Sequence, residues 1–178
     1  MGIKENKMKR LLDFTLKLKH LDRTGWKRKN IKNPETVASH SYQMAMMALY
    51  LSKDYASLYD FDKVIKLCLC HDLAESVIGD ITPSDKAYKN KKIKEMEVMN
   101  KLSCDCDYSE LYDLFVEYEN NETKEAKLAN DLDKLDMYVQ SIDYEKKNPD
   151  LDLEEFRISA RKAISTPIVE EILKSLEK

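Results

Sequence analysis

The sequence is short of the residues that interrupt regular secondary structure. Only 3 of its 178 residues are glycine and 4 are proline. A β-sandwich or β-barrel needs a turn every few residues, so this scarcity argues against both folds. The sequence also has no G-x-G-x-x-G or G-K-[ST] motif, which excludes the glycine-rich loops of dinucleotide-binding and P-loop proteins.

Long apolar runs and an excess of basic charge are missing from the sequence as well. The longest stretch without Asp, Glu, Lys or Arg, residues 36–52, contains histidine, glutamine and several hydroxyl groups. It is too short and too polar to span a membrane. The net charge of −3 is unlike the strongly basic surface of a nucleic-acid binder. We therefore expect neither a membrane nor a nucleic-acid polymer as a partner.

The N-terminus and the cysteines predict a cytoplasmic location. Charge begins at Lys4, and no apolar signal region follows. The four cysteines form two C-x-C pairs, Cys68 with Cys70 and Cys104 with Cys106. This spacing suits neither a zinc knuckle nor a redox C-x-x-C motif. We expect the first pair to be reduced thiols in the core.

The pattern of apolar residues predicts an all-α protein. These residues recur at helical spacing in segment after segment, without a convincing two-residue alternation. The lysine-rich segment 89–92 is expected to be a solvated helix face. One domain is expected over residues 1–178, with helices at 5–21, 35–55, 61–76, 86–103, 108–119, 122–146, 151–164 and 167–177.

Two of the three histidines occupy positions suited to a metal ion. His40 lies on the most apolar face of the second predicted helix, where a single histidine is more often a core residue than a ligand. His71 continues the apolar face of the third predicted helix and is followed directly by Asp72. Glu75 lies one turn further on the same side. Burying these groups without partners is costly, and a divalent cation removes that cost.

A further carboxylate is expected from the helix predicted over residues 122–146. Asp131 shares its side with lysines, which indicates a solvated face with ion pairs. Asp133 falls among small or apolar neighbours instead. Helical periodicity therefore favours Asp133 over Asp131 as the inward-facing carboxylate, without excluding Asp131.

The set of His40, the dipeptide His71-Asp72 and Asp133 on three helices resembles the HD-domain superfamily of metal-dependent phosphohydrolases. Three longer segments are similar to the HD-domain-containing protein 2 family, whose members are 5′-deoxynucleotidases. The resemblance implies a single compact HD-domain helical fold, with a motif-bearing core over about 10–145 and the C-terminal helices at 151–177 packed on it. The three segments are residues 18–26 (LKHLDRTGW), 34–41 (PETVASHS) and 71–83 (HDLAESVIGDITP).

The resemblance also implies a metal cofactor and its ligands. His40, His71, Asp72 and Asp133 match the four ligand positions of the family. Two imidazoles and two carboxylates suit several divalent cations, so the sequence leaves the metal open among Mn, Co, Fe, Ni, Zn and Mg. A homodimer is expected on the same resemblance.

Four more residues match positions that carry the reaction in the family. Glu75 and Asp80 match an acidic pair that is needed for turnover and that in some relatives helps to hold a second ion. Arg23 matches an arginine that contacts the substrate, and Trp26 matches an aromatic residue beside the sugar. Read from the sequence alone, Arg23 could instead form a surface ion pair, and Trp26 could be a buried anchor between helices.

The predicted activity is hydrolysis of a deoxyribonucleoside 5′-monophosphate to the deoxynucleoside and phosphate. One alternative is another HD-type phosphohydrolase that acts on a cyclic nucleotide, a nucleoside triphosphate or an alarmone. A second alternative is a non-catalytic helical interaction module that keeps a structural metal. Assays of phosphate release from different nucleotides separate these functions.

Overall fold

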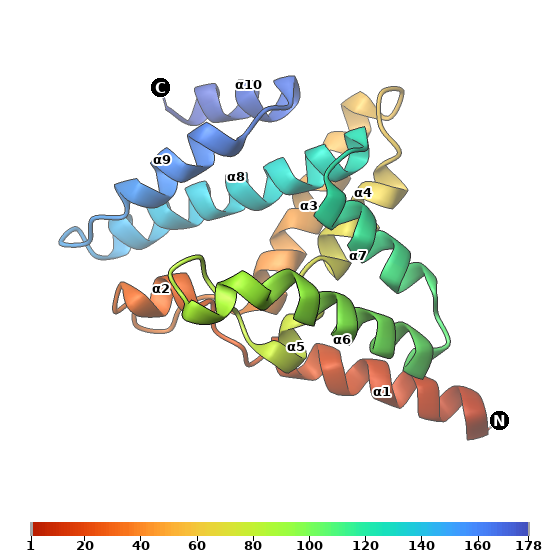
Figure 1. The fold of residues 1–178 in the computed structure, drawn as a ribbon. Coiled ribbons are helices and arrows are strands. Elements are labelled where there is room, and N and C mark those ends of the chain that lie inside the picture. The colour runs from red at the N-terminus through yellow and green to blue at the C-terminus, as the bar shows by residue number, and fades with distance from the viewer. Residues whose placement is uncertain (1, 178) are drawn as a thin grey trace.

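The chain folds into a bundle of helices in the computed structural model, which describes residues 2–177, with side chains from Lys7 onward (Figure 1). Residues 2–177 contain no strand, and one isolated bridge pairs Asp22 with Thr36. The all-α prediction is therefore confirmed. The elements are α1 (Gly2–Leu18), α2 (Thr24–Arg28), α3 (Val37–Tyr55), α4 (Phe61–Cys70), α5 (Glu75–Ile78), the 3₁₀ helix η1 (Lys86–Asn90), α6 (Lys91–Cys106), α7 (Glu110–Asn120), α8 (Lys124–Lys147), α9 (Glu154–Ala163) and α10 (Pro167–Leu176).

Polar side chains fix the starts of the helices that build the centre of the bundle. The Thr36 hydroxyl accepts a hydrogen bond from the Ser39 amide at the start of α3. Asp60 and Thr123 cap α4 and α8 in the same way. Each cap satisfies an amide that has no partner within its helix and contributes about 1 kcal/mol. These caps set which residue begins each helix and therefore which side chains face the core.

One buried apolar cluster extends from Leu18 at the end of α1 to Leu173 in α10. Helices α3, α4 and α8 contact one another at its centre. Helices α9 and α10 both pack on α8, and α1 packs on α6 at the other side of the molecule (Figure 1). The single domain over residues 1–178 remains a prediction, which this shared core supports. No helix within residues 2–177 combines the length and the apolar character needed to cross a membrane.

The helix predicted over residues 61–76 is shorter than expected, because α4 ends at Cys70. The next residues form turns: the Leu73 amide bonds to the Cys70 carbonyl at 3.1 Å, and the Glu75 amide bonds to the Asp72 carbonyl at 3.0 Å. The side chain of His71 bonds to the Cys68 carbonyl as well. His71 and Asp72 therefore lie in a tight turn, and Glu75 begins the separate short helix α5.

Two glycines lie at positions with a specific conformational or packing need. Gly25 is inside α2 rather than beyond a helix end, and a Cβ atom there would lie 3.4 Å from Phe156 Cε1. Gly79 ends α5 with φ 78° and ψ 167°, a region that is almost restricted to glycine. The chain therefore turns sharply at Gly79, directly after α5.

Gly79→Ala is expected to destabilise the fold by about 1–3 kcal/mol through backbone strain. A Cβ atom at this position would have no atom within 4 Å, so steric overlap contributes nothing. Urea unfolding measures the change. Gly25→Ala serves as a comparison without a positive φ, and an unchanged unfolding midpoint for Gly79→Ala would show that the turn relaxes.

Candidate metal centre and active site

Two buried histidines present one unpaired ring nitrogen each to the same space. His40 Nδ1 lies 2.6 Å from Asp136 Oδ2, and His71 Nδ1 lies 2.9 Å from the Cys68 carbonyl oxygen. A carbonyl only accepts, so His71 Nδ1 carries the hydrogen and its Nε2 carries a lone pair. Within the described part of the chain, neither Nε2 atom has a hydrogen-bond partner. Metal-binding histidines are oriented in this way, with the second nitrogen held by the protein.

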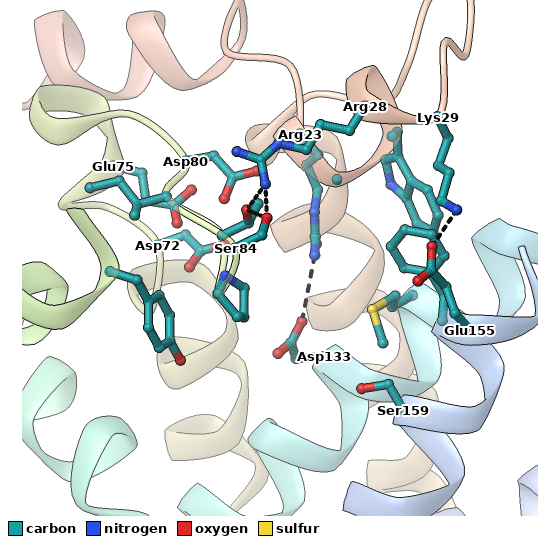
Figure 2. A pocket seen from close by; sticks show the side chains of 18 of the residues that line it. Arg23, Arg28, Lys29, Asp72, Glu75, Asp80, Ser84, Asp133, Glu155 and Ser159 are labelled. Carbon is teal, nitrogen blue, oxygen red and sulfur yellow. Dashed lines mark hydrogen bonds and ion pairs between the residues drawn. The ribbon is translucent and has the colours of Figure 1, made fainter. Parts of the chain in front are cut away.

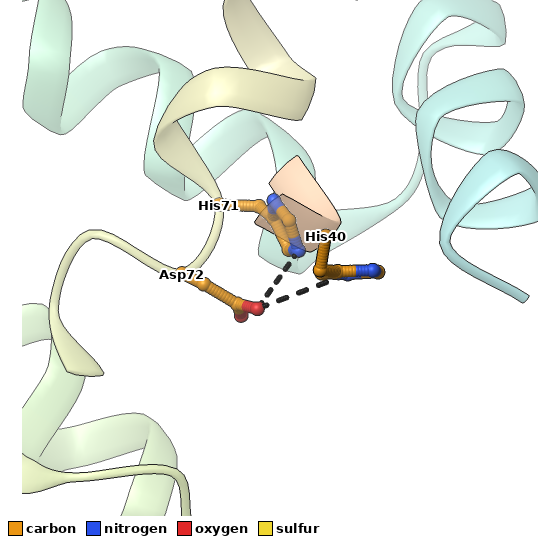
Figure 3. A group of neighbouring side chains, drawn as sticks. All are labelled: His40, His71 and Asp72. Carbon is orange, nitrogen blue, oxygen red and sulfur yellow. Dashed lines mark ion pairs between the residues drawn. The ribbon is translucent and has the colours of Figure 1, made fainter. Parts of the chain in front are cut away.

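Two carboxylates face these nitrogens from different parts of the chain. Asp72 Oδ2 lies 3.1 Å from His71 Nε2 and 4.0 Å from His40 Nε2 (Figure 3). Asp133 Oδ1, on α8, lies 3.2 Å from His40 Nε2. The ligand atoms of His40, His71 and Asp72 all lie within 4.8 Å of one another. Two imidazole nitrogens and two carboxylates form a donor set that fits a divalent transition metal.

The charges of this group are also suited to a cation. Burial would raise the pKa of Asp72, but the positive charge that His71 and His40 carry when protonated outweighs burial and lowers it. Burial opposes ionisation of Asp133 too, and Lys134, His40 and Arg23 outweigh it, so its pKa is well below the ordinary value. Both carboxylates are therefore ionised at neutral pH, as metal ligands must be.

Asp131 does not lie on a solvated face, and this prediction was wrong. Its side chain is buried, and its Oδ2 accepts hydrogen bonds from the amides of Ser165 at 3.0 Å and Thr166 at 2.6 Å. These amides precede α10, whose first residue is Pro167. Asp131 therefore fixes the start of α10 on α8, a contact that periodicity along α8 cannot reveal.

A cavity of about 510 Å³ opens beside the candidate metal ligands and is large enough for a small molecule. Figure 2 shows Arg23 pointing toward Asp133, with the acidic residues Asp72, Glu75 and Asp80 beside it. A second cavity of about 390 Å³ shares Asp72 and Asp133 with the first. Two of the candidate metal ligands, Asp72 and Asp133, thus line both cavities.

Arg23 is a largely buried residue of the site rather than part of a surface ion pair. Its side chain is 18% exposed, and its guanidinium lies 3.9 Å from Glu35 and 4.0 Å from Asp133. The Nη1 atom is buried and has no hydrogen-bond partner within the described residues. A buried N–H group without a partner, beside the candidate metal ligands, can donate a hydrogen bond to an anionic group of a bound small molecule.

Trp26 is a buried anchor that also lines the cavity. It is 1% exposed, and its indole Nε1 donates a hydrogen bond to Glu35 Oε1 at 2.7 Å. Its ring packs on Phe156 of α9 and meets the edge of Tyr144 of α8. The contact of Trp26 with a sugar stays a prediction, because its ring serves the packing of α2 on α8 and α9 in any case.

The acidic residues beyond the HD dipeptide both line the larger cavity. Burial, followed by the charge of Asp72, raises the pKa of Glu75 above its ordinary value, and the charge of Lys91 opposes this shift. Its Oε1 atom lies 3.0 Å from Lys91 Nζ. Asp80 Oδ2 accepts a hydrogen bond from the Thr24 amide at 2.6 Å, which ties the segment after α5 to α2. The structure thus brings Glu75 and Asp80 to the same cavity from different elements.

The expectation of a solvated face over residues 89–92 is wrong for Lys91. Its side chain is 22% exposed and forms ion pairs with Glu75 and Glu95. The signal in the sequence is a stripe on α6 that continues from Lys91 and Glu95 to the buried Met99. The ion pair between Lys134 and Asp133, at 2.7 Å, was not predicted from the sequence either.

Comparisons with known proteins show the family of this chain. An HD-domain family model matches residues 15–177. The proteins named 5′-deoxynucleotidase HDDC2 from Dictyostelium discoideum and Danio rerio are 38% and 40% identical to this chain. Each alignment covers 90% of this chain, with 92% and 82% of the two relatives.

Solved structures share the fold over nearly the whole chain. A conserved hypothetical protein from Pyrococcus furiosus aligns with a TM-score of 0.83 and 32% identity, over 94% of this chain and 97% of the other. The PH0347 protein from Pyrococcus horikoshii aligns with a TM-score of 0.82 and 32% identity, over 94% and 96%. The chain therefore belongs to the HD-domain family, within the group of the HDDC2 proteins.

Proposed function

We propose that this protein is a metal-dependent 5′-deoxynucleotidase, which hydrolyses deoxyribonucleoside 5′-monophosphates to deoxynucleosides and phosphate. The observation that carries the proposal is the pair of unpaired, buried Nε2 atoms of His40 and His71, which face Asp72 and Asp133. This donor set lies beside a cavity of about 510 Å³, within the usual range for small-molecule sites. The names of the HDDC2 relatives support the same activity.

The four residues His40, His71, Asp72 and Asp133 would hold the divalent cation. When bound, the cation supplies Lewis acidity toward the phosphoryl group and makes water a stronger nucleophile near neutral pH. The protein fixes the orientation of these ligands through Asp136 at His40 Nδ1 and the Cys68 carbonyl at His71 Nδ1. The identity of the metal stays open, because this donor set suits several divalent cations.

The remaining residues bind the phosphate and move protons. Arg23 is proposed to donate hydrogen bonds to phosphoryl oxygens, because its fork of N–H groups matches two oxygens at once. Hydrolysis takes oxygen from water and returns a proton to the departing 5′-oxygen, and Glu75 and Asp80 are the carboxyl groups of the cavity proposed for this transfer. Trp26 is proposed to contact the sugar.

The ion pairs of the cavity favour a monophosphate over a triphosphate or an alarmone. Four basic residues besides Arg23 line the cavity, and each has a carboxylate partner. Each additional phosphate would have to compete with these carboxylates for a basic partner. The four pairs are Arg28 with Asp85, Lys29 with Glu155, Lys91 with Glu75 and Lys134 with Asp133.

The experiment that tests the proposal combines metal analysis of the purified protein with a screen for phosphate release. The substrates are deoxyribonucleoside mono-, di- and triphosphates, the corresponding ribonucleotides and a cyclic nucleotide. The proposal predicts highest kcat/KM for deoxyribonucleoside 5′-monophosphates and loss of activity on chelation. Activity confined to a triphosphate or cyclic nucleotide would favour the alternative phosphohydrolase, and folded protein with bound metal but without hydrolysis would favour the non-catalytic module.

Three further expectations belong to this proposal. The protein acts in the cytoplasm, forms a homodimer, and folds as one domain over residues 1–178. The family resemblance supports the dimer, and light scattering of the purified protein tests it. A single cooperative unfolding transition seen by two independent probes tests the single domain.

Arg23→Ala is expected to lower kcat/KM for the monophosphate by at least about tenfold, because hydrogen bonds to charged groups contribute roughly 1.5–3 kcal/mol. Arg23→Lys should recover part of the loss, since lysine keeps the charge without the planar fork. Because Arg23 also lies near Glu35 and Asp133, the alanine variant should lose some stability. Unchanged kcat/KM in both variants would leave Arg23 with a structural role alone.

A further inference from the structure

Glu35 connects the start of α3 to the segment that carries Arg23 and Trp26. It lies directly before Thr36, the residue that caps α3. The backbone carbonyl of Glu35 accepts a hydrogen bond from the Arg23 amide at 3.0 Å. Beside this bond, Asp22 and Thr36 form the isolated bridge of the fold. The residues that lead into α2 are therefore tied by their backbone to the start of α3.

The carboxylate of Glu35 contacts both of these side chains through a single oxygen. Its Oε1 accepts a hydrogen bond from Trp26 Nε1 at 2.7 Å and lies 3.9 Å from Arg23 Nε. The Glu35 side chain is 9% exposed, so water and salt screen these interactions only weakly. One buried oxygen thus fixes the indole and the guanidinium relative to each other.

Arg23 has other carboxylates within reach, and Glu35 opposes their attraction. Its Nη2 lies 4.0 Å from Asp133 Oδ1, and Asp72 and Asp80 line the same cavity. Without a negative charge at its Nε side, the guanidinium would be drawn toward these three groups. With Glu35 in place, Arg23 Nη1 is buried and has no hydrogen-bond partner within the described residues. That N–H group is the one left free for an anion.

We propose that Glu35 is a positioning residue for phosphate binding, whose carboxylate holds Arg23 and Trp26 in place relative to the candidate metal ligands. Glu35 lines neither of the two cavities, so it acts on a bound molecule only through these two side chains. The inference rests on the proposed function for the phosphate and the sugar. It accounts for a nearly buried glutamate that shares one oxygen between an indole and a guanidinium.

The test is calorimetric binding of inorganic phosphate to the metal-loaded full-length chain, with fluorescence recorded on the same samples. Trp26 is the only tryptophan of the sequence, so the emission reports on its indole alone. Glu35→Gln keeps an oxygen for the indole N–H but removes the charge beside Arg23. The emission should stay close to that of the wild type. The affinity for phosphate should fall by about 3–30-fold, a range typical of coupling within one ion-pair network.

Two further variants separate the effects on Arg23 and Trp26. The double variant Glu35→Gln, Arg23→Ala should bind phosphate no more weakly than Arg23→Ala alone, because Glu35 acts through Arg23. Glu35→Ala also removes the acceptor of the indole N–H. It should therefore shift the emission of Trp26 and weaken the binding of thymidine, a deoxynucleoside. On a deoxynucleoside monophosphate, Glu35→Gln should raise KM more than it lowers kcat, as expected for a contact already made in the bound substrate.

Asp22→Asn is the matched control, because it removes the same charge from the residue next to Arg23. The Asp22 side chain is 38% exposed and lies 3.7 Å from Lys27 Nζ. This variant should bind phosphate and metal as the wild type does. Elemental analysis should also find the metal content of Glu35→Gln unchanged.

A role of Glu35 through His40 is the alternative, because side-chain atoms of Glu35, His40 and Asp136 lie within 4.8 Å of one another. Loss of metal from Glu35→Gln would favour this alternative and overturn the inference. Equal phosphate affinity and KM in Glu35→Gln and Asp22→Asn would overturn it as well. Tighter phosphate binding by Glu35→Gln would have the same consequence, because Glu35 would then compete with phosphate for Arg23.

The outcome does not depend on every variant being stable or on turnover. If Glu35→Ala does not fold, Glu35→Gln decides, since its amide has the size of the carboxylate. Phosphate affinity is measured without hydrolysis. A chain with the expected pattern of phosphate binding that does not hydrolyse deoxynucleoside monophosphates would therefore contradict only the proposed function.

Discussion

Asp133→Ala is expected to abolish metal binding and nucleotide hydrolysis together. Asp133 Oδ1 faces His40 Nε2 at 3.2 Å, and Oδ2 is held by Lys134 at 2.7 Å. Removing this carboxylate deletes a ligand and leaves the positive charges of Lys134 and Arg23 without their partner. We expect a loss of turnover of more than about 100-fold, beyond the 10–100-fold typical for outer partners of a metal site. Elemental analysis and phosphate release measure the two effects on the same sample.

Asp131→Ala is the matched control on the same helix, and its expected effect is of a different kind. The Asp131 carboxylate accepts hydrogen bonds from the amides of Ser165 and Thr166, and each amide left without a partner costs about 1–3 kcal/mol. The variant should therefore unfold at lower urea concentration but keep its metal and most of its activity at low temperature. Loss of metal from Asp131→Ala, with metal retained in Asp133→Ala, would reverse the assignment of the ligand.

Glu75→Gln is expected to leave the first metal ion bound and to lower turnover by roughly 10²–10⁴, the usual contribution of general acid–base catalysis. The amide keeps the size of the side chain, and its oxygen can still accept a hydrogen bond from Lys91, which lies 3.0 Å from Glu75 Oε1 in the native protein. Only the ability to exchange a proton and the negative charge are lost. Single-turnover kinetics and metal content measured on one preparation separate catalysis from binding.

The outcome that would remove Glu75 from the mechanism is unchanged turnover with normal metal content. Asp80→Asn provides the comparison, because Asp80 lines the same cavity but is bonded to the Thr24 amide. A larger loss of turnover in Asp80→Asn than in Glu75→Gln would assign the main proton transfer to Asp80.

Helical periodicity in the sequence predicted the fold class and the inward direction of several site residues. His40 and Asp133 lie on the apolar sides of long helices with clear caps at Thr36 and Thr123, so their orientation follows from spacing along one helix. The motifs around His71 and Gly79 were visible for the same reason, since they are local in the sequence. The helix boundary at Cys70 was not predicted, because apolar spacing does not distinguish a helix from the tight turns that follow it.

The contacts that tune the site were decided by the tertiary structure. His40 and Asp136 are 96 residues apart, and Lys91 and Glu75 belong to different helices. Whether a lysine faces solvent or a buried carboxylate depends on which element packs over it. The position of the lysine along its own helix is the same in both cases, so periodicity does not distinguish them. The sequence by itself therefore determined an all-α chain with candidate metal ligands. Only the packing of distant helices brought those ligands together, placed Lys91 beside Glu75 and buried Asp131, because long-range contacts leave no periodic trace in the sequence.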